Sequence, residues 1–356
     1  KILILSNNAL SKSSSNGRTL ENLLLGWPKN KLAQLYIISD EPDFDVCNNY
    51  YFVSDLDAVK ALFGKLNDGR VQYKNESREI QLNKRPNVNN KIKKNAFTML
   101  ARELVWGTKK WMNFGFNEWV SSYQPEVILL QAGDSAFMCN LAQNLSRKFE
   151  APLIIYNSEG YYFKNYDYFR AKGFSHFLYP VFKKLFCHSF EKTIKLASMS
   201  IYICEALKKE YDTTFNLPSE TIYTATTLKP FDMVRKKIKC DDFTVSYLGN
   251  LGVGRLDSLC EIGEILNCID PNAHLDIYGK CPNEKNRKKM EESKGIRYKG
   301  FISYEQVIKV MHESDLLVHV ESFEEFYRED SKFAFSTKIA DSLASGTCFL
   351  LYAPKE

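Results

Sequence analysis

The sequence lacks the features of several protein classes. Its nine cysteines are scattered and none forms a Cys-x-x-Cys pair, which argues against a disulfide framework or a zinc site and favours reduced, buried thiols in a cytosolic protein. No signal peptide is recognisable, and the first apolar run (residues 1–5) is far too short to cross a bilayer. The net charge of +5 is too small by itself to indicate nucleic-acid binding.

The features that are present fit a two-domain α/β protein. At 356 residues, with 44% hydrophobic and 26% charged residues, the chain can bury a large core. Apolar runs alternate with helical patterns, which predicts parallel, doubly wound sheets. We expect a Rossmann-like domain over residues 1–228, a basic linker at 229–242 and a second Rossmann-like domain over 243–356.

The alternation predicts the following elements. In the first half, strands are expected at residues 2–5, 32–38, 127–130, 153–156 and 199–204, and helices at 19–25, 55–64, 97–123, 136–149 and 205–211. In the second half, strands are expected at 243–248, 273–278, 296–298, 315–320 and 347–352, and helices at 254–267, 283–293, 304–313 and 337–344. The basic, Asn-rich residues 65–95 show no periodicity and are expected to form a surface insertion.

Polar residues follow three strands of the first half. Gly17 ends a polar loop after the first strand, and Asp134 and Glu159 come directly after the strands at 127–130 and 153–156. Open α/β sheets bind ligands at the carboxyl ends of their strands, so these residues are candidates for the active cleft. A mobile surface loop and ordinary helix caps or turns remain equally open interpretations.

Residues 161–195 are dense in tyrosine and phenylalanine, interleaved with lysine and arginine. Such a stretch suits an anionic membrane surface. A buried aromatic helix with a solvated basic edge explains it as well, and stacking on single-stranded nucleic acid is less well supported because no RNA-binding module is recognisable. The tryptophans at 106, 111 and 119 indicate a core or a membrane-facing helix.

A glycine loop opens the second half. The apolar run 243–248 leads to Gly249-Asn250-Leu251-Gly252-Val253-Gly254, then to Arg255 and a helical pattern. Glycines allow close approach of the backbone to a ligand, and the free N–H groups that open a helix attract anions. Arg255 adds a forked cation suited to phosphate. The pattern predicts a diphosphate site, with a plain strand-to-helix turn as the alternative.

Four motifs in this half resemble the nucleotide-sugar domain of GT-B glycosyltransferases, in particular the large retaining family four. They are the glycine loop with Arg255, residues 298–302, residues 315–322 and residues 335–346. Together they cover most of residues 243–354, whereas the first half matches in architecture alone. The resemblance implies two Rossmann-like domains that face each other across a cleft, and it implies that the second domain here lacks part of its closing element at the C-terminus.

The resemblance also assigns residues to the donor. Asp341 would accept the ribose hydroxyls, Lys338 and Arg255 would reach the phosphates, and Ser336 and Thr337 would bind the diphosphate at a helix start. For each, a solvated surface residue or a simple N-cap is the alternative. The nucleotide-sugar-binding residues expected in all are Gly17, Gly249, Asn250, Gly252, Arg255, Gly300, Phe301, Ser336, Thr337, Lys338 and Asp341.

The acids of the site are less clear from the pattern. The family often has two acids eight positions apart; the later one here is Asp341, but Phe333 stands eight residues earlier and residues 323–332 look like an insertion. We favour Glu321 as the first acid, with Glu324 as the alternative. Asp134 or Glu159 would orient the acceptor.

The expected reaction moves a sugar from a nucleoside-diphosphate sugar to a glycan or lipid-linked acceptor, with retention of configuration. Fixed cations and helix N–H groups would stabilise the departing diphosphate, so no metal and no cofactor is expected. We expect a cytoplasmic protein at the inner face of the membrane, in surface polysaccharide or glycoconjugate synthesis, with no nucleic-acid partner. A nucleotide-sugar epimerase and a non-catalytic partner subunit on the same fold, and a dinucleotide oxidoreductase, remain alternatives.

Overall fold

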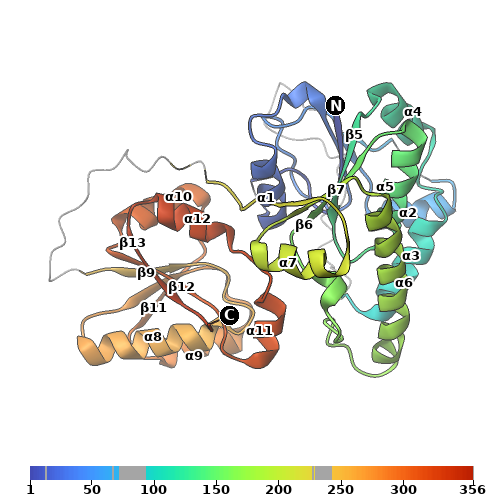
Figure 1. Cartoon of the computed structure of the whole chain (residues 1–356). Coiled ribbons are helices and arrows are strands. Elements are labelled where there is room, and N and C mark those ends of the chain that lie inside the picture. The colour runs from blue at the N-terminus through green and yellow to red at the C-terminus, as the bar shows by residue number, and fades with distance from the viewer. Residues whose placement is uncertain (13, 66–67, 72–93, 227, 229–242, 356) are drawn as a thin grey trace. The chain divides into compact units, whose positions relative to one another are not determined.

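A computed structural model describes residues 1–12, 14–65, 68–71, 94–226, 228 and 243–355. It divides into two compact units, unit 1 over Lys1–Tyr223 and unit 2 over Thr224–Glu356 (Figure 1). The predicted linker at 229–242 and most of the predicted insertion at 65–95 lie outside the described residues.

Unit 1 is built on an eight-stranded sheet of order β4-β3-β2-β1-β5-β6-β7-β8. The strands are β1 (Ile2–Ser6), β2 (Leu32–Tyr36), β3 (Tyr50–Phe52), β4 (Arg70–Val71), β5 (Val127–Ala132), β6 (Leu153–Asn157), β7 (Met199–Tyr202) and β8 (Ser219–Thr221). All neighbours are parallel except β3 and β4. The order reverses between β1 and β5, which makes that point of the edge the topological switch point of the sheet.

The helices of unit 1 cover this sheet. They are α1 (Ser15–Leu23), α2 (Asp55–Leu62), α3 (Ala96–Gly107), α4 (Phe114–Tyr123), α5 (Ala136–Phe149), α6 (Phe174–Leu196) and α7 (Glu205–Thr214), with 3-10 turns η1 (Lys29–Lys31) and η2 (Tyr161–Phe163). Helices α3 and α5 both pack against α6, and in Figure 1 they are coloured from cyan (α3) to green (α5 and α6). Strands β1 and β5 are almost wholly buried, as expected for a parallel sheet with both faces covered.

Several elements of unit 1 differ from the expected ones. The single helix predicted over 97–123 is two helices, because the first ends at Gly107 and the Asn113 side chain caps the second by accepting a hydrogen bond from the N–H of Phe116. The short strands β3, β4 and β8 were not predicted.

The three tryptophans of this region (Trp106, Trp111 and Trp119) are buried in the core and do not face outward.

The aromatic segment 161–195 is divided between core and surface. On α6, Phe182, Phe186 and Phe190 are buried, whereas Phe174 and Phe177 are 70% and 78% exposed. The interpretation as a buried aromatic helix therefore holds for one face of α6 only.

Unit 2 is built on a five-stranded, wholly parallel sheet of order β11-β10-β9-β12-β13. Its strands are β9 (Val245–Leu248), β10 (Leu275–Tyr278), β11 (Ile296–Gly300), β12 (Leu316–Val320) and β13 (Cys348–Tyr352), and its helices are α8 (Arg255–Ile269), α9 (Glu284–Glu292), α10 (Tyr304–Glu313), α11 (Glu325–Ser331) and α12 (Thr337–Ala344). The predicted alternation is confirmed, with α11 as an unpredicted short helix inside the segment interpreted as an insertion. The two parallel-sheet units confirm the predicted α/β class.

Within the described part of the chain, none of the helices combines the length and the apolar character that crossing a bilayer requires.

Candidate functional site

The glycine loop joins β9 to α8 through a backbone that only glycine tolerates at one position. Gly254 is the N-cap of α8 with φ of +69°, and a Cβ atom there would collide with the Tyr327 ring and lie 2.5 Å from the Ser322 hydroxyl oxygen. Val253 also has a positive φ, of +61°, which is unusual for a β-branched residue and marks local strain. Gly254 was missing from the predicted site, although its place directly before the cation was a usable signal.

The loop is held in shape from within. The Asn250 side-chain oxygen accepts the N–H of Gly252 at 2.9 Å, and the buried Tyr247 hydroxyl donates to the Asn250 carbonyl at 2.8 Å. Burial raises the pKa of Tyr247 to about 12, so the hydroxyl stays protonated. A side chain at Gly249 would collide with this hydroxyl. Asn250 therefore fixes the loop through both its side chain and its carbonyl group.

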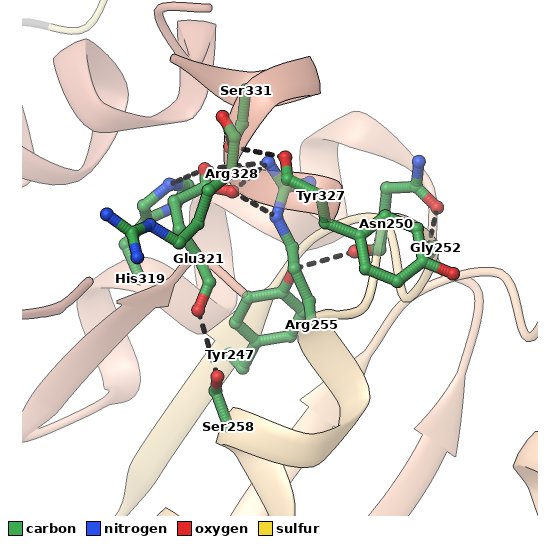
Figure 2. A network of polar contacts seen from close by, with 10 residues as sticks. All are labelled: Tyr247, Asn250, Gly252, Arg255, Ser258, His319, Glu321, Tyr327, Arg328 and Ser331. Carbon is green, nitrogen blue, oxygen red and sulfur yellow. Dashed lines mark hydrogen bonds and ion pairs between the residues drawn. The ribbon is translucent and has the colours of Figure 1, made fainter. Parts of the chain in front are cut away.

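Arg255, the first residue of α8, is paired with Glu321, which follows β12 (Figure 2). Its Nη2 lies 2.7 Å and 2.9 Å from the two carboxylate oxygens, and its Nε lies 3.1 Å from Oε2. The Arg255 and Glu321 side chains are only 15% and 21% exposed. Burial acts to raise the pKa of Glu321, but the hydrogen bonds from His319 and Arg255 outweigh it and hold the pKa below its usual value.

Glu321 is held by three further contacts, two of them drawn in Figure 2. The His319 Nε2 lies 3.1 Å from Glu321 Oε1, and the Ser258 hydroxyl donates to the Glu321 carbonyl at 2.9 Å. The Glu321 N–H donates to the Tyr352 carbonyl at the end of β13. His319 and Ser258 were not predicted as site residues. The position of His319 on β12, two residues before the acid that follows this strand, was the signal in the sequence.

Helix α12 carries the predicted ribose and phosphate residues. Ser336 is its N-cap and makes no side-chain capping bond, and Thr337 and Lys338 form its first turn. Asp341 is 6% exposed and lies 3.4 Å from the Tyr304 hydroxyl of α10. A solvated helix residue is therefore the wrong description of Asp341, and Tyr304 is a neighbour that the motif did not reveal.

The predicted base-pocket residues follow β11. Gly300 has φ of +84° and its carbonyl accepts the N–H of Gly279 at 2.9 Å. Phe301 is 78% exposed, so its ring is open to a ligand. A side chain at Gly279 would collide with the Gly249 carbonyl, which makes Gly279 a further glycine that the loop packing requires.

These residues of unit 2 share one edge of its sheet. The strands β9 to β12 are parallel, so Gly249, Gly279, Phe301 and Glu321 all follow carboxyl ends, where doubly wound sheets bind ligands. Direct contact is seen between Arg255 and Glu321, whereas Asp341 contacts α10.

In unit 1, Asp134 follows β5 and is only 2% exposed. The Lys94 Nζ lies 3.5 Å from its Oδ1. Burial, and secondly the Asp134 charge, raise the pKa of Tyr168. Asp134 is therefore a buried acid between a lysine and a tyrosine hydroxyl, two neighbours that were not predicted.

Glu159 follows the adjacent strand β6 and is more open, with a side chain 40% exposed. The Lys164 Nζ lies 3.6 Å from Glu159 Oε2 and 5.1 Å and 5.7 Å from the ring centroids of Tyr161 and Tyr168. Since Tyr168 also lies against Asp134, Lys164 and Tyr168 link the two predicted acids at one edge of the sheet.

The expectation that Gly17 ends a loop is wrong. Gly17 lies in the first turn of α1, where its N–H donates to the Ser14 hydroxyl at 3.2 Å and a side chain would collide with the Ala9 carbonyl. The helix begins four residues before the predicted start because Ser14 caps it. Close packing is the reason that the structure offers for a glycine here.

The described residues contain no group of three or more His, Cys, Asp and Glu side chains that could hold a metal ion. The acids of one Asp-x-Asp pair, Asp55 and Asp57, make structural contacts: Asp55 accepts from Arg102 and Trp106, and Asp57 completes the capping box of α2. Metal independence stays a prediction.

Comparisons with known proteins identify the fold of the whole chain. No protein-family model matches the sequence, and no curated protein matches it. Among solved structures, the chain is similar to a lipopolysaccharide outer core galactosyltransferase, WaaB, with a TM-score of 0.54 and 11% identity over 99% of this chain and 86% of that one. It is similar to Anabaena HepE in complex with UDP and glucose, with a TM-score of 0.56 and 12% identity over 99% and 80% of the two chains.

A glycosyltransferase from Rickettsia africae is similar as well, with a TM-score of 0.51 and 13% identity over 99% of this chain and 79% of that one. Identities this low show a shared fold and carry no information on substrates. The chain therefore has the GT-B fold that its second-half motifs predicted.

Proposed function

We propose that the protein is a glycosyltransferase that moves a sugar from a nucleoside-diphosphate sugar to an acceptor hydroxyl, with retention of configuration. The observation that carries the proposal is the pairing of Arg255 with Glu321 beside a strained glycine loop at the carboxyl edge of the unit 2 sheet. A permanent cation, a helix N-terminus and an acid meet there, as transfer from a diphosphate requires. The GT-B fold, shared with the galactosyltransferase WaaB, supports the same reaction class.

In this proposal, the diphosphate binds at the start of α8 and α12. Arg255, Lys338 and the N–H groups that follow Ser336 stabilise the negative charge that builds up as the diphosphate leaves. Asp341 accepts the ribose hydroxyls, and Phe301 provides an apolar wall for the base. Glu321 faces the donor sugar. UDP is the first nucleotide to test, since HepE was solved with UDP and glucose.

The acceptor side of the reaction is assigned to unit 1. Asp134 and Glu159 orient the acceptor hydroxyl, with Lys164 and Tyr168 linking them. Attack from the face of the departing diphosphate gives retention, with no covalent enzyme intermediate. Fixed cations take the place of a metal, so the proposal includes neither a metal nor a cofactor.

We further propose a cytoplasmic enzyme that works at the inner face of the membrane in surface polysaccharide or glycoconjugate synthesis, on a glycan or lipid-linked acceptor. Support comes from the basic and aromatic segment 161–195, of which Phe174 and Phe177 are exposed.

The test is thermal unfolding of the protein with UDP, GDP, CDP and their sugars. A ligand that binds only the folded state raises the unfolding midpoint, and the stabilisation grows with the logarithm of its concentration over Kd. We expect a shift with one nucleotide, which Arg255→Gln abolishes. Arg287→Gln is the matched control, since Arg287 is an exposed arginine on α9 with its own acidic partner. Shifts with none of the nucleotides, or equal loss in both variants, would refute the proposal. If the protein converts a nucleotide sugar to its epimer when no acceptor is present, it is an epimerase.

A further inference from the structure

Unit 1 contains a groove of about 680 Å³ between α3, α5 and α6. Its volume lies in the range of small-molecule sites. The lining is mainly apolar, and its large apolar side chains include Leu100, Leu104, Trp106, Trp111, Phe137 and Leu185. Trp106 and Phe137 stack at 4.4 Å between ring centroids, which gives the groove a rigid aromatic wall.

The exposed charged residues that line this groove in the described part of the chain are all basic. Lys109, Arg147 and Lys192 line it and are exposed. The acid among the described lining residues, Glu103, is buried, and its two oxygens accept the N–H groups of Ala136 and Phe137 at the start of α5. A ligand in the groove therefore meets apolar walls and a positive rim.

The groove continues into an exposed apolar stripe on α6. Phe174, Phe177, Val181 and Leu185 follow each other at helical spacing on one face and are 70%, 78%, 56% and 40% exposed. Leu185 belongs to both the stripe and the groove, and Leu104 of α3, on the other side of the groove, is 77% exposed. Contiguous exposed apolar side chains next to cations mark an interaction surface.

We infer that this α3–α5–α6 face binds an anionic lipid of a bilayer, with an acyl chain in the groove and the headgroup phosphate on Lys109, Arg147 and Lys192. Apolar side chains that enter the acyl region and lysines that meet anionic headgroups are the two parts of interfacial binding. The site extends the membrane contact proposed above: it assigns the lipid to a groove that the sequence pattern did not reveal. It is independent of the donor site, which lies in unit 2.

The experiment is co-sedimentation of the whole chain with vesicles of phosphatidylglycerol and phosphatidylcholine, and with vesicles of phosphatidylcholine alone. We expect binding to the anionic vesicles, weakened by salt. Leu104→Ser/Leu185→Ser and Arg147→Gln/Lys192→Gln each lower it about tenfold, from lost apolar burial and lost headgroup attraction respectively. Ile265→Ser/Ile269→Ser is the matched control and leaves binding unchanged, because these α8 side chains are 56% and 77% exposed in the other unit.

Occupancy of the groove itself is read from tryptophan fluorescence. Trp106 and Trp111 line the groove, whereas Trp27 is exposed elsewhere in unit 1 and is replaced by Phe in the protein used. Phosphatidylglycerol brominated on its acyl chain quenches the groove tryptophans if the chain enters. Quenching that persists in Leu104→Ser/Leu185→Ser would overturn the inference.

Three other outcomes also overturn it: equal binding to both kinds of vesicle, no vesicle binding at all, and self-association of the chain that the serine variant abolishes, which would make the face a protein interface. The UDP thermal shift is measured on the same samples. A normal shift together with no vesicle binding by the unaltered chain would refute the lipid site alone and leave the proposed transferase function standing.

Discussion

Replacing Glu321 by Gln should tighten the binding of UDP while it abolishes sugar transfer. The Arg255 guanidinium is paired with Glu321 through contacts of 2.7 to 3.1 Å. A diphosphate that uses Arg255 must displace this carboxylate, and the two anions repel each other. The neutral amide of Gln leaves Arg255 charged and available.

The size of the effect follows from the burial of the pair. Exposed ion pairs contribute about 0–1 kcal/mol, whereas removal of one partner from a buried pair costs about 3–5 kcal/mol. The Arg255 and Glu321 side chains are 15% and 21% exposed, so the pair lies between these limits. We take about 1–2 kcal/mol as the pairing free energy that is lost when the diphosphate displaces Glu321. The variant has no such loss, so its Kd for UDP should be roughly 5- to 30-fold lower.

Isothermal titration calorimetry with UDP at neutral pH and fixed salt measures this change. Glu324→Gln is the control. Glu324 is an exposed acid three residues after Glu321, so the variant loses the same charge and should keep the Kd within about twofold. Weaker binding by Glu321→Gln would refute the reasoning, because it would mean that Glu321 holds Arg255 in its binding geometry instead of competing with the ligand.

Three further results are expected. Gly254→Ala should lower the free energy of unfolding, measured in urea, by about 1–3 kcal/mol, because of the positive φ and the collision with Tyr327. The control Gly252→Ala, at a negative φ, should lower it by less. Equal losses in the two variants would contradict the strain argument. Burial raises the pKa of Glu103 to about 7, whereas the pKa of Glu in the unfolded chain is about 4.3. Between these two pH values the folded state binds an extra proton. The free energy of unfolding of unit 1 should therefore fall as pH rises through this window. All four tryptophans lie in unit 1, so urea unfolding followed by their fluorescence measures this slope, which Glu103→Gln should flatten; an unchanged slope would contradict it. Asp341→Asn should weaken UDP binding about tenfold in calorimetry and leave pyrophosphate binding unchanged, because only the nucleoside offers ribose hydroxyls; parallel loss of both would refute its role.

Much of the architecture followed from local patterns in the sequence. Helices α10 and α12 begin and end where they were predicted, since Ser303 forms a capping box with Gln306 and apolar residues recur at helical spacing. Apolar runs marked the central strands because both faces of a parallel sheet are buried. The glycine loop before Arg255 was visible because strand, turn and helix are consecutive in the chain.

Residues that are distant in the chain were brought together by tertiary structure alone. Arg255 and Glu321 are 66 positions apart and meet because β9 and β12 are neighbours in the sheet, an order that no local pattern encodes. Strands of two or three residues, such as β3 and β4, exist only through their pairing partners. The sequence of α6 displayed its aromatic and basic character, but packing against α3 and α5 decided which rings became core and which remained exposed, because burial depends on the neighbours that the fold supplies.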